Sequence, residues 1–519
     1  MSTNTAQLDP EGTATSTATV APHRGAPHSG APHTDDRASR AHGRRWWVLG
    51  IAALAQLIVV LDATIVNIAL PTAQGALGFS NDSRQWLITG YALAFGALLL
   101  IGGRLSDLFG RRLMFTIGLI GFAAASALGG AASSFEILLT ARGLQGVFGA
   151  LIAPAALSLL TVTFTDSKER ARAFAVFGAV AGSGGALGLI LGGALTEYAS
   201  WRWCMFVNVP LAALAVIGAA VFLPKQVKAA VKPGFDVPGS IVIVLGLVSL
   251  VYGLAQAETK GWSSAVTLGF TLAGIALIGV FGVIETKVAH PLLPIRILRD
   301  RTRGGAYAAV AVVGAGMFAV FLFLTYYMSA TLQFTPLQTG FAFLPMIGGI
   351  MVSVQLTPAF VSRIGAKVPV TVGMLVAAAG MLYLTRLDLD STYVAHILPG
   401  LIVMGLGIGA VMGTAFGAAT LGVDPVDAGV ASAVVNTVQQ IGGSVGTAVL
   451  SAVSAAAATA YLTENGTSPA AAAQAAMDSY TTAFWWAAGI FTLGAIVCGM
   501  LLRHGAVAVD PEAPKVVAH

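Results

Sequence analysis

Long apolar segments alternate with short polar segments from residue 46 to residue 502. Each apolar segment has about the 20 residues with which a helix crosses the ~30 Å hydrocarbon core of a bilayer. Internal Pro and Gly fit this interpretation, because helices in lipid tolerate them. The pattern predicts fourteen membrane-spanning helices, at residues 46–70, 84–103, 112–132, 135–163, 171–196, 203–223, 237–256, 262–285, 304–328, 337–359, 367–385, 394–420, 428–459 and 479–502.

The two ends of the chain have a different pattern. Residues 1–45 show no apolar period, are rich in Ala, Thr, Pro, His and Gly, and contain Ala-Pro-His three times. Such a composition cannot form a packed core, so we expect a disordered cytoplasmic tail. Residues 503–519 are expected to form a second cytoplasmic tail.

The composition supports a membrane protein and excludes two other classes. Of the 519 residues, 56% are hydrophobic and 10% are charged, whereas a soluble domain carries about 25% charged residues. The net charge of +5 is small for a protein that binds nucleic acid. We therefore expect an all-α polytopic membrane protein, and neither a soluble enzyme nor a nucleic-acid binder.

The distribution of Lys and Arg predicts the orientation. With the N-terminus in the cytoplasm, the inner segments hold 23 of the 28 basic residues and the outer loops hold four, while Arg142 lies inside a span. Cytoplasmic loops carry such an excess of positive charge. We expect a multi-pass protein of the cell (inner or plasma) membrane with both termini in the cytoplasm.

A weak internal repeat predicts the domain organisation. The loops at residues 107–112 and 362–367 share a Gly and a final basic residue, and spans 5 and 13 are both rich in Gly. Repeated halves around a central site are typical of secondary transporters. The prediction is an N-terminal six-helix bundle at 46–223, an inserted helix pair at 237–285 and a C-terminal six-helix bundle at 304–502.

Two charged residues lie deep inside predicted spans. Asp62 is in span 1 and Arg142 in span 4, and both fall in the outer half at similar depths. If the two spans are neighbours, the residues could pair. Burial disfavours the charged form of the carboxyl and a nearby guanidinium favours it, and such a balance suits a group that couples transport to protons. The alternative is a static ion pair that only positions two helices.

A charged loop and a glycine-rich face complete the motifs. The loop at residues 103–112 holds Gly103, Asp107, Gly110, Arg111 and Arg112, and it predicts either a conformational latch or simple anchoring by positive charge. Span 5 carries small residues at four-residue spacing, which allows close helix contact. The functional interpretation is a sliding seal between the halves, and the alternative is tight packing. The glycines of this face are Gly184, Gly188, Gly192 and Gly193.

These motifs together resemble the major facilitator superfamily, and within it the fourteen-span drug:proton antiporters, which include multidrug and quaternary-ammonium efflux pumps. The resemblance covers residues 46–503, with Leu189 in span 5 where the family has Pro. It implies a major facilitator fold in which Asp62 is the proton-linked acid and Arg142 its partner. It also implies that the loop at 103–112 is the conformational latch.

The resemblance also implies which spans line a substrate cavity. Aromatic and Met side chains there suit bulky apolar ligands, although some of them must face lipid or neighbouring helices. No acid lies deep in the C-terminal half, so neutral or monocationic lipophiles are favoured over dications. The cavity candidates are Gln56, Asn67, Tyr91, Gln145, Phe318, Phe321, Tyr326, Met346, Asn436 and Gln440.

The sequence thus predicts a secondary active transporter that exports lipophilic drugs or antibiotics in exchange for protons by alternating access. A proton-coupled transporter dedicated to one metabolite or natural product is the alternative. We expect a monomer in the lipid bilayer whose partners are a small lipophilic substrate and protons. Neither a cofactor nor a metal site nor an enzymatic activity is predicted, since no span holds a catalytic or metal-ligand pattern.

Overall fold

The computed structural model describes residues 35–164, 166–223, 234, 236–420, 423 and 428–503. Within these residues the chain is helical and has no strand. Helix α1 begins inside the segment predicted as a tail, and most of both predicted tails lies outside the described residues. The helices are α1 (Asp35–Leu77), α2 (Asn81–Phe109), α3 (Arg111–Gly130), α4 (Phe135–Thr163), α5 (Ser167–Tyr198), α6 (Trp203–Phe206), α7 (Asn208–Phe222), α8 (Val237–Lys260), α9 (Ala265–Glu285), α10 (Ile295–Arg299), α11 (Arg301–Ala330), α12 (Pro336–Ala342), α13 (Leu344–Ile364), α14 (Lys367–Leu384), the π-helix η1 (Tyr393–Ile397), α15 (Leu398–Thr420), α16 (Ala428–Asn465) and α17 (Pro469–Leu501).

Fourteen spans in the described residues are long and apolar enough to cross a membrane, which confirms the predicted number. Three of them are built from two consecutive helices, namely α6 with α7, α12 with α13, and η1 with α15. Each break lies one to three residues before a proline: Pro210, Pro345 or Pro399. Proline lacks an N–H and disfavours helical backbone in the residue before it, which accounts for breaks at these places.

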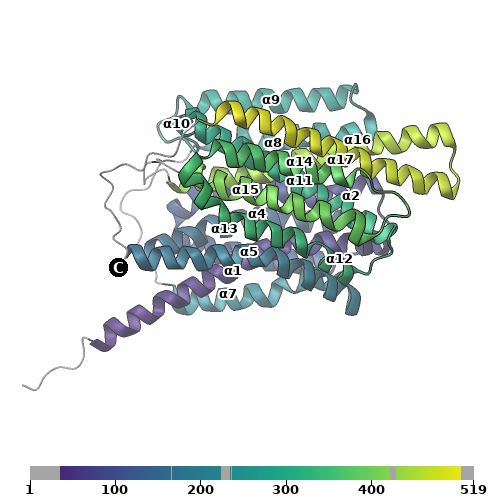
Figure 1. Ribbon diagram of the computed structural model, residues 1–519. Helices are drawn as coiled ribbons and strands as arrows, with labels where there is room; N and C mark the ends of the chain where they lie inside the picture. Colours follow the sequence, from purple (N-terminus) through teal and green to yellow (C-terminus); the bar gives the residue numbers. More distant parts are fainter. Residues whose placement is uncertain are drawn as a thin grey trace, which may run out of the picture. The chain divides into compact units, whose positions relative to one another are not determined.

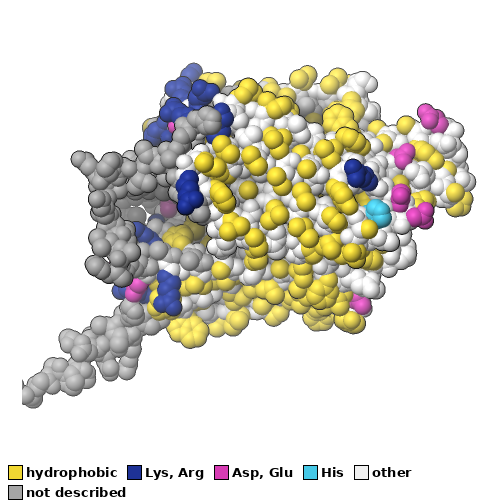
Figure 2. Space-filling model, viewed as in Figure 1, with side chains coloured by type: hydrophobic (Ala, Val, Ile, Leu, Met, Phe, Trp, Pro, Cys, Tyr) yellow, Lys and Arg dark blue, Asp and Glu magenta, His cyan; other side chains and the backbone are white. Residues whose placement is uncertain are grey.

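Charged side chains divide the helix ends into two groups. Arg104, Arg112, Arg363 and most other described basic residues lie at one end of the spans, here called the basic end. The opposite end, here called the far end, carries acids such as Asp390 and Glu464. Figure 2 shows Lys and Arg gathered at the left of the bundle and acidic side chains at the right.

The helices pack in groups that follow the chain (Figure 1). In the first half, α4 packs against α2 and α3, and α3 against α7. In the second half, α11 packs against α16 and α17, and α15 against α13 and α14. The inserted helices α8 and α9 pack against each other, and α8 also contacts α2 and α16.

The two halves meet where α2 packs against α16 and, at the far end, through polar contacts. The Tyr326 hydroxyl on α11 donates a hydrogen bond of 2.6 Å to the Gln74 side chain on α1, and the Arg84 guanidinium lies 4.1 Å from the Tyr326 ring centre. The backbone N–H of Leu337 donates to Glu197 at 3.1 Å, which joins α12 to α5. These bonds hold the two halves together at the far end.

Candidate functional site

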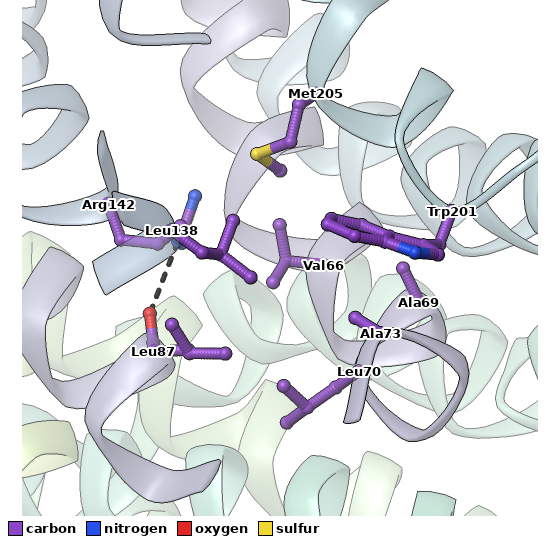
Figure 3. A pocket seen from close by; sticks show the side chains of 9 residues that line it. All are labelled: Val66, Ala69, Leu70, Ala73, Leu87, Leu138, Arg142, Trp201 and Met205. Atoms are coloured by element: carbon purple, nitrogen blue, oxygen red, sulfur yellow. Dashed lines mark hydrogen bonds between the residues drawn. The ribbon is translucent and has the colours of Figure 1, made fainter. Parts of the chain in front are cut away.

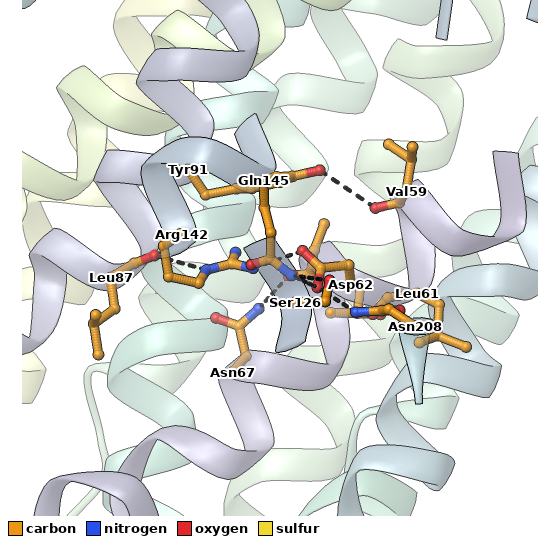
Figure 4. A network of polar contacts seen from close by, with 12 residues as sticks. Val59, Leu61, Asp62, Asn67, Leu87, Tyr91, Ser126, Arg142, Gln145 and Asn208 are labelled. Atoms are coloured by element: carbon orange, nitrogen blue, oxygen red, sulfur yellow. Dashed lines mark hydrogen bonds and ion pairs between the residues drawn. The ribbon is translucent and has the colours of Figure 1, made fainter. Parts of the chain in front are cut away.

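A buried ion pair lies inside the first half (Figure 4). Asp62 on α1 has no solvent-exposed surface, and Arg142 on α4 is 2% exposed. The Arg142 Nη1 atom donates a hydrogen bond of 2.6 Å to Asp62 Oδ2. The two helices thus bring together the two charged residues that lie deep in predicted spans.

Two amide side chains also donate to the Asp62 carboxylate. Gln145, one turn after Arg142 on α4, donates from Nε2 to Asp62 Oδ1 at 2.8 Å. Asn208, the first residue of α7, donates from Nδ2 to the same oxygen at 2.7 Å. Gln145 Nε2 also donates to the Ser126 hydroxyl of α3 at 2.8 Å. The carboxylate is therefore held by side chains from two helices besides its own.

The Arg142 side chain is fixed on three further sides. Its Nε atom donates to the Leu87 carbonyl of α2 at 3.2 Å, and Nη1 also donates to Gln145 Oε1 at 2.8 Å. The guanidinium carbon lies 4.3 Å from the centre of the Tyr91 ring, a cation–π contact. The Tyr91 hydroxyl in turn donates to the Val59 carbonyl of α1 at 3.4 Å.

This geometry determines where a proton can be bound. A carboxylate offers about four lone-pair positions. Asp62 Oδ1 already accepts two hydrogen bonds and Oδ2 accepts one. The free lone pair is therefore on Oδ2, the oxygen that faces Arg142. A proton bound there would neutralise the carboxylate and weaken its attraction for the guanidinium.

An apolar pocket leads from the far end toward Arg142 (Figure 3). It has about 270 Å³ of empty space, including space open to solvent. Trp201 and the end of α1 line one side, and Arg142 is the charged residue in its wall. The lining residues are Val66, Ala69, Leu70, Ala73, Leu87, Leu138, Arg142, Trp201 and Met205.

Comparison with known proteins identifies the family. A model described as Major Facilitator Superfamily matches residues 52–447. The chain belongs to the major facilitator superfamily. It is 45% identical over 483 residues to the puromycin resistance protein pur8 of Streptomyces alboniger, which covers 91% of this chain and 96% of the relative. It is 35% identical over 406 residues to the cephamycin export protein CmcT of Amycolatopsis lactamdurans, covering 78% of this chain and 83% of the relative.

Solved structures show the same major facilitator fold. An auto-inhibited peptide transporter of the POT family has a TM-score of 0.64 at 16% identity and covers 91% of this chain and 98% of its own. A bacterial homologue of the human lysosomal transporter Spinster, solved in an inward-facing and unoccupied conformation, has a TM-score of 0.58 at 17% identity and covers 89% and 98%. The family match, the named relatives and the fourteen apolar spans indicate a multi-pass membrane transporter rather than an enzyme.

The loop at residues 103–112, the predicted latch of this major facilitator protein, is only loosely paired. Arg111 lies 3.9 Å from Asp107, and the Asp107 side chain is 46% exposed. Arg112 does not pair with Asp107. Its guanidinium donates to the carbonyls of Leu223 at 2.8 Å and Ala220 at 3.0 Å, so it caps the end of α7.

Two glycines of the predicted latch serve its geometry. Gly110 separates α2 from α3 with φ of 99°, a conformation that favours glycine. Gly103 lies in α2 opposite Pro154 of α4, where an added Cβ would be 3.8 Å from the proline Cβ. Gly110 thus permits the turn between α2 and α3, and Gly103 lies in ordinary contact with α4.

The glycine face of α5 packs mainly within its own half. A Cβ on Gly188 would lie 1.9 Å from Thr64 Oγ1, and one on Gly192 would lie 2.9 Å from the Ile65 carbonyl, both on α1. Gly184 also faces α1, at Leu57 and Val60. Gly193 differs, because its Cβ would lie 2.6 Å from Leu337 Cα in the second half. Among the four glycines, Gly193 is therefore the one that lies against the second half.

Leu189, which stands where the family has Pro, is fully buried within a continuous α5. Position 189, where the family has Pro, thus lies within an unbroken helix. The Leu189 carbonyl faces Gly340 of α12, where an added Cβ would approach it to 2.4 Å. This contact and the one at Gly193 join α5 to the second half.

The ten cavity candidates lie in different parts of the structure. Tyr91 and Gln145 belong to the Asp62 network, and buried Asn67 donates to the Ala63 carbonyl at 2.9 Å. The second half buries Phe321, which packs against Phe343 at 4.9 Å, and Met346. The structure places no single pocket around the ten among the described residues. Phe318 contacts Gly443, Gln440 contacts Gly96, and Tyr326 lies at the far end. Gln56 on α1 is half-buried, and Asn436 on α16 is exposed.

Sequence reasoning missed three contributors to the Asp62 network. Ser126 is a small hydroxyl residue in an apolar span, and the Leu87 contribution is a backbone carbonyl, which no side-chain pattern can reveal. Asn208 had a usable signal, because an amide at the start of a span needs a hydrogen-bond partner.

Proposed function

We propose that this major facilitator transporter exports lipophilic drugs or antibiotics from the cytoplasm in exchange for protons, by alternating access. The names of its relatives support export, since they include resistance and export proteins for puromycin, cephamycin and tetracenomycin. The observation that carries proton coupling is the fully buried Asp62 carboxylate, with one free lone pair on the oxygen that faces Arg142.

Protonation and deprotonation of Asp62 drive the cycle in this proposal. Loss of the negative charge weakens the bond to Arg142, so the guanidinium holds more tightly to Leu87 and Gln145. Helices α1 and α4 can then shift relative to each other. Return of the charge restores the present arrangement. Proton movement down the membrane potential supplies about 2.3 kcal/mol per charge per 100 mV.

The orientation follows from the charges at the helix ends. The excess of positive charge at the basic end supports a cytoplasmic position for that end and for both termini. The far end, where the halves are joined, then faces outward. In this proposal the contacts at the far end close the transporter to the outside, in the state that receives substrate from the cytoplasm. The pocket beside Arg142 supports a route for protons from the far end to Asp62.

Reconstituted protein tests this function. Fluorescent lipophiles should be exported against their gradient when a pH gradient is imposed on proteoliposomes. Asp62→Asn should keep substrate binding and lose this uphill transport. Glu464→Gln, which changes an exposed acid at the far end, is the matched control and should transport as the parent does. Uphill transport by Asp62→Asn would remove Asp62 from the mechanism.

Export of a single natural product is the second candidate. It is favoured by the names of the relatives, several of which refer to one compound each: puromycin, lincomycin and tetracenomycin C. A panel of unrelated dyes separates the two candidates. A dedicated exporter should move none of the dyes, and a multidrug exporter should move several.

A further inference from the structure

Two buried acidic residues lie close together at the basic end, far from Asp62 in the chain. Asp236 precedes α8 and is 5% exposed, and Glu285 ends α9 and is 4% exposed. Asp236 Oδ1 caps α8 by accepting from the Gly239 N–H at 2.9 Å. Glu285 accepts from the backbone N–H groups of Leu292 at 3.3 Å and Leu293 at 2.9 Å.

The two carboxyls meet over a glycine. A Cβ on Gly239 would lie 2.0 Å from Asp236 Oδ2 and 3.1 Å from Glu285 Oε1, so the two oxygens occupy the space that a side chain would fill. Asp236 Oδ2 is buried and has no hydrogen-bond partner. A buried acceptor without a donor is costly, and two carboxylates this close repel each other. One bound proton removes both costs.

We propose that Asp236 and Glu285 form a proton-binding site that shares one proton between Asp236 Oδ2 and Glu285 Oε1. A metal ion fits less well, since no group of three or more His, Cys, Asp or Glu gathers anywhere in the described residues. Within the described residues, the charged or titratable side chains on the adjoining elements are Arg104 of α2, Lys287 and His290 of the segment after α9, and Arg296 and Arg299 of α10. The hydrogen bonds described for the two carboxyls come from backbone N–H groups.

The site holds the segment that joins the inserted helices to the second half. Glu285 binds the amides of Leu292 and Leu293, and both of these side chains are buried. The adjacent Pro291 carbonyl accepts a hydrogen bond of 2.7 Å from Arg104, in the charged loop at 103–112. Residues 286–294 are thus fixed to α9 on one side and to α2 of the first half on the other.

Proton loss would therefore act on the contact between the halves. With one proton the pair stays closed and residues 291–293 stay bound to Glu285. When both carboxyls are charged, repulsion separates them and Glu285 releases the two amides. The Arg104 contact then loses its support. The site makes the position of this segment respond to pH at the basic end, without any change at Asp62.

Distance measurements test this site without transport. Spin labels at Phe109 and Leu298, both exposed at the basic end, report the separation of α2 and α10, in a background with Cys204 and Cys498 replaced by Ala. Double electron–electron resonance on the full-length protein in lipid nanodiscs measures the distance between the labels. The measurements run from about pH 5 to about pH 9, the range in which buried carboxyls titrate. The parent should show a pH-dependent shift in distance, and Glu285→Gln should keep the low-pH distance throughout.

Three further variants make the result specific. Asp236→Asn keeps the helix cap and should also lose the pH-dependent shift in distance. This variant tests the proposal even if Glu285→Gln does not fold. Asp300→Asn, at another acid of the basic end, should keep the shift. Asp62→Asn should keep it too, so the outcome is separate from that of the proposed transport mechanism. A shift that survives in both pair variants, a parent with no shift, or a shift that follows sodium at constant pH would overturn the proposal.

Discussion

The two halves of the molecule bury different kinds of polar group. The first half buries Asp62 and Arg142 together with the amides of Gln145 and Asn208. In the described part of residues 304–502, the buried polar side chains other than tyrosine are all Ser or Thr, and no charged residue is buried. A hydroxyl in a helix can bond to its own backbone, as Thr357 and Thr414 do, whereas a buried charge needs a partner on another helix.

This difference indicates that the two halves respond differently to protons. A charge pair can change state with one proton, so the first half has the means to respond to the proton gradient. The buried aromatic and Met side chains of the second half, such as Phe321 and Met346, carry no charge and cannot change state in this way. Substitutions in the two halves should therefore differ in the kind of defect they cause.

The largest effect is expected from breaking the charge pair. Arg142→Met leaves the buried Asp62 carboxylate without its cation, which should cost about 3–5 kcal/mol of unfolding free energy and all transport. The double variant Asp62→Asn/Arg142→Met removes both charges and should recover most of the stability but no transport. Thermal unfolding in detergent measures the first effect and proteoliposome uptake the second. Equal stability of the parent and Arg142→Met would contradict the comparison.

A substitution in the second half should destabilise without changing the response to pH. Met346 is fully buried, so Met346→Ala should cost about 2–5 kcal/mol through the cavity it leaves. The remaining transport should keep the parental pH profile. Met500→Ala, at a Met that is 63% exposed, is the control and should change stability by less than about 0.5 kcal/mol. An altered pH profile in Met346→Ala would show that the second half also takes part in proton coupling.

A smaller effect is expected where α5 meets α1. Gly188→Ala introduces a Cβ that would lie 1.9 Å from Thr64 Oγ1, and such overpacking costs about 1–3 kcal/mol. Gly185→Ala, where nothing lies within 4 Å of the added Cβ, should be tolerated. Adding Thr64→Ala to Gly188→Ala should restore part of the lost stability and transport. If Gly185→Ala proves as harmful as Gly188→Ala, close packing is not the cause.

The smallest effect is expected at the contact between the halves at the far end. Arg84→Ala removes the guanidinium over the Tyr326 ring, a contact worth about 0.5–1 kcal/mol, or roughly a two- to five-fold change in the equilibrium between closed and open far ends. Single-molecule fluorescence between labels on α2 and α11 measures that ratio. Arg386→Ala, whose cation lies 5.7 Å from a ring in its own half, is the control.

Much of the fold could be predicted from sequence, and the site only in part. Membrane helices follow from local hydrophobicity, so all fourteen spans were found, although the breaks before Pro210, Pro345 and Pro399 were not. Asp62 and Arg142 stood out because charge is rare in lipid. The rest of the network depends on which helices are neighbours. For that reason no sequence pattern predicts the bond of Asn208 to Asp62, or that of Arg112 to the end of α7.

Helix α5 contacts both halves of the molecule, through α1 and through α12, at neighbouring positions along its length. Its Gly184 and Gly192 lie against the α1 turns before and after Asp62, while Gly193 lies against α12. With backbone so close on both flanks, α5 has little freedom to yield when the second half tilts. A displacement of α12 would therefore be transmitted through α5 to the turn of α1 that bears Asp62.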